Sequence, residues 1–142
     1  MFLSIKNIPK VNWSSNESLN FKPKFSTSFF LIFGLTIFGL GEGLLILSTT
    51  GNSPWSVLAE GISLNSNLSI GAATFFVSVG VLFLWIFLKQ KPGLGTIFNI
   101  IVIAAMIDFT LNYFQPPSSF FTKHLLAVLS VILVGLGSGI YL

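Results

Sequence analysis

The sequence predicts an all-α transmembrane protein, a bundle of four membrane-spanning helices with one additional short helix. Of its 142 residues, 53% are hydrophobic and only 8% are charged, whereas about 25% of the residues of a soluble domain are charged. The mean hydropathy of +0.89 agrees with this bias. So few charges cannot cover a water-facing surface, and this excludes a soluble enzyme, a disordered chain and a typical nucleic-acid-binding protein.

Four apolar runs are long enough to cross a membrane as helices, at about residues 25–48, 68–88, 94–114 and 121–142. A helix of about 20 residues crosses a hydrocarbon core of about 30 Å. The runs lack the two-residue alternation of barrel strands, so helices are expected. Residues 1–24 are polar and are interpreted as a cytoplasmic tail, which leaves residues 25–142 as the transmembrane domain.

The lysines predict how the chain is oriented in the membrane. Six of the seven lie in the tail or in the turn at 89–91, which a four-span chain places on one side. The other side holds only Lys123. Because cytoplasmic loops carry the excess of basic residues, the N-terminus is expected to be cytoplasmic in a multi-pass protein of the cell membrane.

The segment between the first two spans predicts a short helix over about residues 54–61 that does not cross the membrane. Ser53 is a good N-cap, and Pro54 stands at the first helical position, where its missing N–H has no cost. Gly61 is expected to stop the helix. Two placements stay open: an interfacial helix anchored by Trp55, or a re-entrant half-helix whose positive N-terminus faces a solute or ion.

Two acidic residues lie inside predicted spans, Glu42 in the first and Asp108 in the third. Each lies about 20 Å along its helix from the cytoplasmic end of the span, so both are expected at similar depth toward the outer leaflet. One hypothesis is a proton- or cation-responsive pair with Lys123 and His124 as counter-ions, since charges in a membrane tend to face the bundle interior. The alternative is that each is hydrated near the outer interface.

Neutral polar residues also occur within the second and third spans. Asn99, Thr74 and Ser78 are expected to form hydrogen bonds between helices. Asn99 and Asp108 are nine residues apart, about 180° around a helix, so they cannot share one face. Asp108 is the one expected to face protein or a cavity.

Glycines in the first and last spans suggest close helix packing and an internal repeat. Gly39 and Gly43 form one small-xxx-small pair, and Gly135 and Gly139 form another. Both stretches read Gly-Leu-Gly-x-Gly, and three spans separate their starts, so the second copy is inverted in the membrane. Inverted repeats are typical of secondary transporters. The chain is therefore expected to be the first half of a longer inverted-repeat protein, with a loosely docked last span.

Several motifs in order carry a family resemblance: Gly39-Leu-Gly41, Gly51-Asn-Ser-Pro-Trp-Ser-Val-Leu58, Gly61, Leu68-Ser-Ile-Gly71, Lys91-Pro-Gly-Leu-Gly-Thr96, Asn99 and Ile107-Asp108. Over about residues 30–142 the chain resembles the YczE-like family of bacterial integral membrane proteins, which is related to the YyaS and YitT types. The resemblance implies a helical membrane protein and no particular activity. Family members usually have Asp where this chain has Ser56, and a neutral residue where it has Glu42.

The first functional hypothesis is a small-solute transporter or permease-like protein, and the alternative is a non-transporting membrane regulator or scaffold. An enzyme is not expected, because no Ser–His, His–carboxylate or metal-ligand spacing is present, and no cofactor or metal is expected either. Expected partners are the lipid bilayer and a small solute or proton, with a second copy of the chain left open. A transporter would have a cavity lined by its candidate site residues: Glu42, Ser53, Pro54, Trp55, Asn99 and Asp108.

Overall fold

The computed structural model describes residues 23–90 and 92–141. Most of the expected tail at 1–24 therefore lies outside the described residues, as do Lys91 and Leu142. The described chain forms five helices: α1 (Phe25–Ser48), α2 (Pro54–Leu64), α3 (Ile70–Phe87), α4 (Leu94–Tyr113) and α5 (Phe120–Tyr141). Four of them, all but α2, are long and apolar enough to cross a membrane. The predicted fold class, a helical membrane bundle with a short extra helix, is confirmed.

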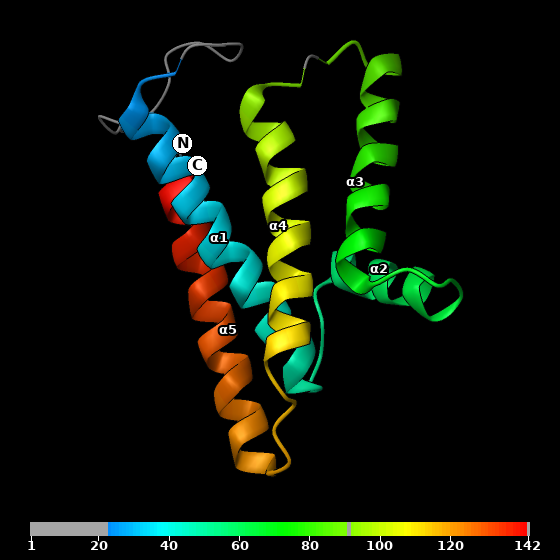
Figure 1. Ribbon diagram of the computed structural model, residues 1–142, viewed down its shortest axis with the longest axis vertical. Helices are drawn as coiled ribbons and strands as arrows, with labels where there is room; N and C mark the ends of the chain where they lie inside the picture. The colour runs from blue at the N-terminus through cyan, green and yellow to red at the C-terminus, as the bar shows by residue number, and fades with distance from the viewer. Residues whose placement is uncertain (1–22, 91, 142) are drawn as a thin grey trace, which may run out of the picture.

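The long helices stand side by side and alternate in direction (Figure 1). α1 lies between α5 and α4, α3 packs on the far side of α4, and α2 packs against α3. α2 crosses the long helices at a steep angle, at the level where α3 begins, and the ends of α1 and α4 and the start of α5 extend beyond that level (Figure 1). The start of α1 and the end of α5 meet at the opposite end of the bundle.

Glycines bring α1 into close contact with both of its neighbours. A Cβ built at Gly39 or Gly43 would lie 2.7 Å from Met106 Cβ or 2.6 Å from Thr110 Cβ of α4. Gly41 packs in the same way against Val134 of α5. Small residues that let backbones approach are typical of membrane helix interfaces, where lipid supplies no hydrophobic drive for association.

The glycines of α5 require a correction. Gly135 and Gly139 were expected to form a packing face, but a Cβ built at either meets no described atom within 4 Å. The close approach is at Gly137, where a Cβ would lie 2.6 Å from the backbone nitrogen of Phe38. Gly137 lies 200° around the helix from Gly135 and from Gly139, so it faces α1 when they face away. α5 is thus closely packed along α1 rather than loosely docked.

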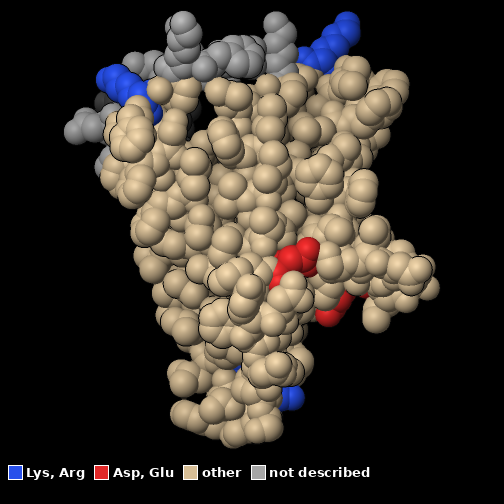
Figure 2. Space-filling model, viewed as in Figure 1, with Lys and Arg blue, Asp and Glu red and all other residues tan. Residues whose placement is uncertain are grey.

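The buried apolar core is small and lies between α1 and α4. Leu35 and Ile46 of α1 meet Ile103 and Ile107 of α4, and Leu35 is fully buried. Most other large apolar side chains point outward, including many phenylalanines of α1, α3 and α5. Figure 2 shows one face as a broad uncharged surface, with blue atoms at its two ends and red atoms near α2. Such an apolar belt between charged ends suits a protein solvated by lipid.

The short helix is longer than predicted. α2 begins at Pro54 with Ser53 as its N-cap, whose hydroxyl accepts a hydrogen bond from Ser56 N. It does not stop at Gly61 but continues to Leu64. The side-chain amide of Asn65 donates to the carbonyl of Gly61, so a polar side chain just beyond the helix satisfies a carbonyl of its last turn.

Candidate functional site

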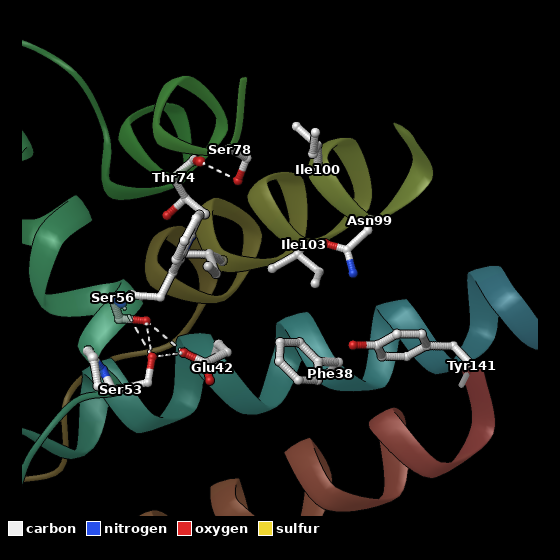
Figure 3. A pocket seen from close by; sticks show the side chains of 13 residues that line it. Phe38, Glu42, Ser53, Ser56, Thr74, Ser78, Asn99, Ile100, Ile103 and Tyr141 are labelled. Carbon is white, nitrogen blue, oxygen red and sulfur yellow. Dashed lines mark hydrogen bonds between the residues drawn. The ribbon is translucent and has the colours of Figure 1, made fainter. Parts of the chain in front are cut away.

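The carboxylate of Glu42 joins α1 to the first turn of α2. Glu42 is only 8% exposed. Its Oε2 accepts hydrogen bonds from the hydroxyls of Ser53, at 2.9 Å, and Ser56, at 2.6 Å. Figure 3 shows the two serines facing Glu42 across the gap between the helices. α2 therefore begins where α1 offers an acceptor, and two short hydroxyl side chains one turn apart reach the same oxygen.

The α2 N-terminus also favours a negative charge at Glu42. The N–H groups of a first turn carry partial positive charge, worth about 0.3–1 kcal/mol to a nearby anion and up to about 2 kcal/mol when partly buried. A carboxylate at the centre of a membrane helix costs about 2.5–3.5 kcal/mol on insertion scales. The helix end and the two hydroxyls offset much of that cost without supplying a positive ion.

The carboxylate of Asp108 makes a second junction, between α4 and the first turn of α3. Its Oδ2 accepts from the Ser69 hydroxyl at 2.6 Å, and its Oδ1 accepts from the backbone N–H of Gly71 at 2.8 Å. Ser69 is the N-cap of α3 and accepts from Ala72 N at 3.1 Å. Asp108 faces protein, as expected, but both of its oxygens are used to hold α3.

The two carboxylates therefore bind two different helix starts, and neither takes Lys123 or His124 as a hydrogen-bonded partner. His124 is exposed on the first turn of α5, where its Nδ1 lies 2.9 Å from the carbonyl oxygen of Phe120. Within the part of the chain that the structure describes, no three His, Cys, Asp or Glu side chains gather as metal ligands would.

A cavity of about 530 Å³ opens beside Glu42, between α1, the start of α2, α3 and α4. Five of the six predicted site residues line it, and Asp108 does not. Its lining is mainly apolar and aromatic with a few polar side chains: Phe38, Glu42, Ser53, Pro54, Trp55, Ser56, Thr74, Ser78, Asn99, Ile100, Ile103, Ile107 and Tyr141. A concave apolar space with a few converging polar groups is the usual form of a small-molecule site.

Asn99 faces this cavity from α4, on the side of the helix opposite to Asp108, as the nine-residue spacing requires. Thr74 and Ser78 reach it from α3 (Figure 3). Their expected role as hydrogen bonds between helices is wrong, because their hydroxyls donate to carbonyls of α3 itself, Thr74 to Ile70 and Ser78 to Thr74, both at 2.8 Å. Hydroxyls in apolar helices commonly bond the preceding turn in this way.

Eight of the thirteen lining residues were not among the predicted site residues, and Ser56, Phe38 and Tyr141 are three of these. Ser56 follows the N-cap by three residues, and that spacing on a first turn was the available signal. Phe38 lies one helical turn before Glu42, so it shares the Glu42 face. Tyr141 is 103 residues from Phe38 in the sequence, and only the packing of α5 on α1 brings their rings together, edge to face with centroids 5.9 Å apart.

A second, smaller cavity of about 130 Å³ continues from the first between α3 and α4. It shares Trp55, Ser78, Asn99 and Ile100 with the larger cavity. It then reaches Trp85 near the end of α3 and Thr96 near the start of α4. Together the two cavities follow the α3–α4 interface from the level of α2 toward the end of the bundle at which α1 starts.

Comparison with known proteins finds relatives of the family that the sequence resembles. The chain is 36% identical to an uncharacterised protein of Haemophilus influenzae over 97% of its own length and 62% of the relative. It is 29% identical to the uncharacterised membrane protein YczE of Bacillus subtilis, over 79% of the chain and 53% of YczE. Its identity to the uncharacterised protein YyaS of Bacillus subtilis is 31%, over 77% of the chain and 56% of YyaS.

The chain thus spans about half to three fifths of the length of these relatives. No solved structure matches it significantly. Residues 25–142, the entire set of predicted spans, match a family of unknown function, DUF6198. These matches confirm the predicted kinship with YczE-like proteins, and the chain is an integral membrane protein that belongs to the DUF6198 family.

Proposed function

We propose that this chain is part of a small-solute transporter or permease-like protein whose binding site is the cavity beside Glu42. One observation carries the proposal: a buried carboxylate at the wall of a cavity of about 530 Å³, inside a bundle of membrane-spanning helices. Ionisable residues inside membrane helices are rare, and they commonly mark solute or ion pathways. The cavity is proposed to bind its solute without changing it chemically.

The placement of α2 supports a re-entrant half-helix rather than a purely interfacial one. Ser53 meets Glu42 six residues before α1 ends at Ser48, which is about 9 Å of helix. The chain therefore turns back along α1 before α2 begins. Half-helices that start inside the bundle and point their N-termini at a site are a recurring transporter device.

The smaller cavity supports a route away from the site. It extends the lining along α3 and α4 from Asn99 to Trp85 and Thr96, toward the end at which Lys24 and Lys89 lie. We propose that this end is cytoplasmic, following the excess of lysines there, so the α2 end faces outward. A solute bound beside Glu42 would then leave inward between α3 and α4.

The proposed inverted repeat is supported by how the two Gly-Leu-Gly-x-Gly stretches are used. The middle glycines, Gly41 of α1 and Gly137 of α5, both lie at the α1–α5 contact. The first and last glycines of the α1 stretch, Gly39 and Gly43, pack against α4. Their equivalents in α5, Gly135 and Gly139, have no described atom near their missing Cβ atoms. A helix equivalent to α4 would pack there if the second copy followed the same plan.

A membrane regulator or scaffold is the rival function. The observation that favours it is the outer side of α2, where Trp55, Val57 and Leu58 are 42–55% exposed and could dock a partner. A scaffold would not need solute to enter the cavity beside Glu42, so a measurement of solute movement separates the two.

The test is uptake of a panel of labelled solutes by proteoliposomes that carry the chain, with and without a pH gradient. We expect at least one solute to enter faster than into empty liposomes, and Glu42→Gln to slow it at least tenfold. Gly80→Ala is the matched control, because Gly80 has no described atom near its missing Cβ and lies outside the cavity. No uptake of any solute would favour the scaffold.

A further inference from the structure

We infer that the solute class of the cavity beside Glu42 is a small organic cation, an amine or quaternary ammonium with a compact apolar body. The inference rests on the proposed function and deepens it by naming what the site recognises. It is drawn from three properties of the lining: its charge, its aromatic rings and its donor set.

The charge of the lining has one sign. Glu42 is the only charged side chain among the thirteen described residues that line the cavity, and none of these thirteen is Lys, Arg or His. Both serine hydroxyls bond the same oxygen, Oε2, and Oε1 accepts no hydrogen bond from the described residues. The two hydroxyls and the α2 N-terminus offset only part of the cost of this charge, and a carboxylate removed from water is usually paired with a positive charge. A bound cation would supply the pairing that the protein itself omits.

The aromatic rings extend the same preference over the rest of the cavity. Phe38, Trp55 and Tyr141 all contribute to the lining. Figure 3 shows Phe38 between Glu42 and Tyr141 along the α1 side, with Asn99 facing them from α4. Aromatic faces attract alkylammonium groups through their quadrupoles, most strongly where water is excluded. A carboxylate beside several rings is the arrangement that holds a cation with an organic body.

The single carboxylate and the apolar wall of the cavity argue against other ligand classes. A divalent metal takes several oxygen ligands, commonly from more than one carboxylate, and the lining offers one carboxylate. An anion would be repelled by Glu42. A neutral solute could donate a hydrogen bond to Oε1 but would leave the negative charge of Glu42 unpaired, and the isoleucines Ile100, Ile103 and Ile107 would offer it only apolar contact. The apolar wall suits instead the methyl or methylene groups that an organic cation carries.

The test compares cations with neutral molecules of the same shape, bound to the chain in lipid nanodiscs and measured by calorimetry. The first pair is choline and 3,3-dimethylbutan-1-ol, in which carbon replaces the quaternary nitrogen. The second pair is benzylamine, protonated at pH 7, and benzyl alcohol. We expect each cation to bind at least tenfold more tightly than its neutral partner. Glu42→Gln should reduce this preference to less than threefold, because it keeps an acceptor for Ser53 and Ser56 but removes the charge.

Two controls keep the result interpretable. Asp108→Asn removes the other intramembrane charge and should leave the preference for cations unchanged, because Asp108 does not line the cavity. Circular dichroism reports whether each variant is folded. Equal binding of the cation and its neutral partner overturns the cation assignment. A preference that survives Glu42→Gln overturns the inference that Glu42 recognises the cation. Either result leaves solute binding intact. Failure of all four molecules to bind also overturns it, and the uptake panel then decides separately whether any solute is carried.

Discussion

Two junctions in this bundle are built from the same parts and have different consequences. At each, a carboxylate of one span binds the serine N-cap of a neighbouring helix: Glu42 binds Ser53 of α2, and Asp108 binds Ser69 of α3. The serine in turn accepts from the backbone N–H three residues on. The α3 junction is closed, whereas the α2 junction borders a cavity of about 530 Å³.

The residue at the second helical position explains the difference. In α3 it is Gly71, which has no side chain, so α4 comes close enough for Asp108 to accept the Gly71 N–H with its second oxygen. In α2 that position is Trp55, and the first position is Pro54, which has no N–H to offer. Glu42 therefore binds hydroxyls with one oxygen only. Gly71 thus permits a closed junction with both carboxylate oxygens bound, whereas the junction at Trp55 borders a cavity.

The largest effect is expected from Gly71→Ala. Its Cβ would overlap the carbonyl oxygen of Ala104, which cannot move without shifting α4, and the carboxyl carbon of Asp108, which cannot move without losing its hydrogen bonds to α3. Overpacking of this kind typically costs about 1–3 kcal/mol, and we expect the upper end. Thermal unfolding in detergent, followed by circular dichroism, measures it. Gly80→Ala in the same helix should instead be neutral or stabilising, by up to about 1 kcal/mol, because Ala favours helix. Equal stabilities for the two variants would contradict a tight α3–α4 clamp.

The next effect separates the two carboxylates. Asp108→Ala strands the Ser69 hydroxyl and the Gly71 N–H and should lower the unfolding free energy by about 1–3 kcal/mol. Glu42→Gln keeps an oxygen for both serines and should cost less than about 1 kcal/mol. Chemical denaturation of both variants checks this. A larger loss for Glu42→Gln than for Asp108→Ala would make Glu42 the structural residue and weaken its role in binding.

The two N-cap serines should have similar effects on stability and different effects on binding. Removing a serine cap typically costs about 1 kcal/mol, so Ser53→Ala and Ser69→Ala should unfold at similar points. Only Ser53→Ala should weaken choline binding, by a factor of about three to ten, because Ser53 orients Glu42. Equal binding by both variants would show that the hydroxyl does not position the carboxylate.

The smallest effect on stability is expected from cysteines that test orientation. The chain has no Cys of its own. Asn67→Cys, in the exposed loop after α2, should react with an impermeant maleimide added outside intact cells. Gln90→Cys, exposed after α3, should react only after the membrane is permeabilised. The reverse pattern would place both junctions on the cytoplasmic side and invert the proposed route.

Local sequence alone determined the helices of this protein. Apolar length defines the four spans because a long apolar run without the alternation of a barrel strand can satisfy its backbone in lipid only as a helix. Ser53-Pro54 defines the start of α2 because capping depends on a few adjacent residues. The end of α2 was missed because Asn65 bonds back to Gly61, so one glycine did not decide it.

Tertiary structure decided which partner each polar or small residue has. The Gly-x-Gly-x-Gly stretch of α5 offers different faces, and only the packing on α1 selects Gly137 over Gly135 and Gly139. Likewise, a carboxylate in a span must find a partner, but its position in the sequence does not say which. Asp108 accepts a hydrogen bond from the first turn of α3, and Tyr141 of α5 lines the cavity although it is distant in sequence from the other lining residues. The physical reason is that a helix repeats every 3.6 residues whatever surrounds it, whereas the angle and distance between helices depend on every contact along them.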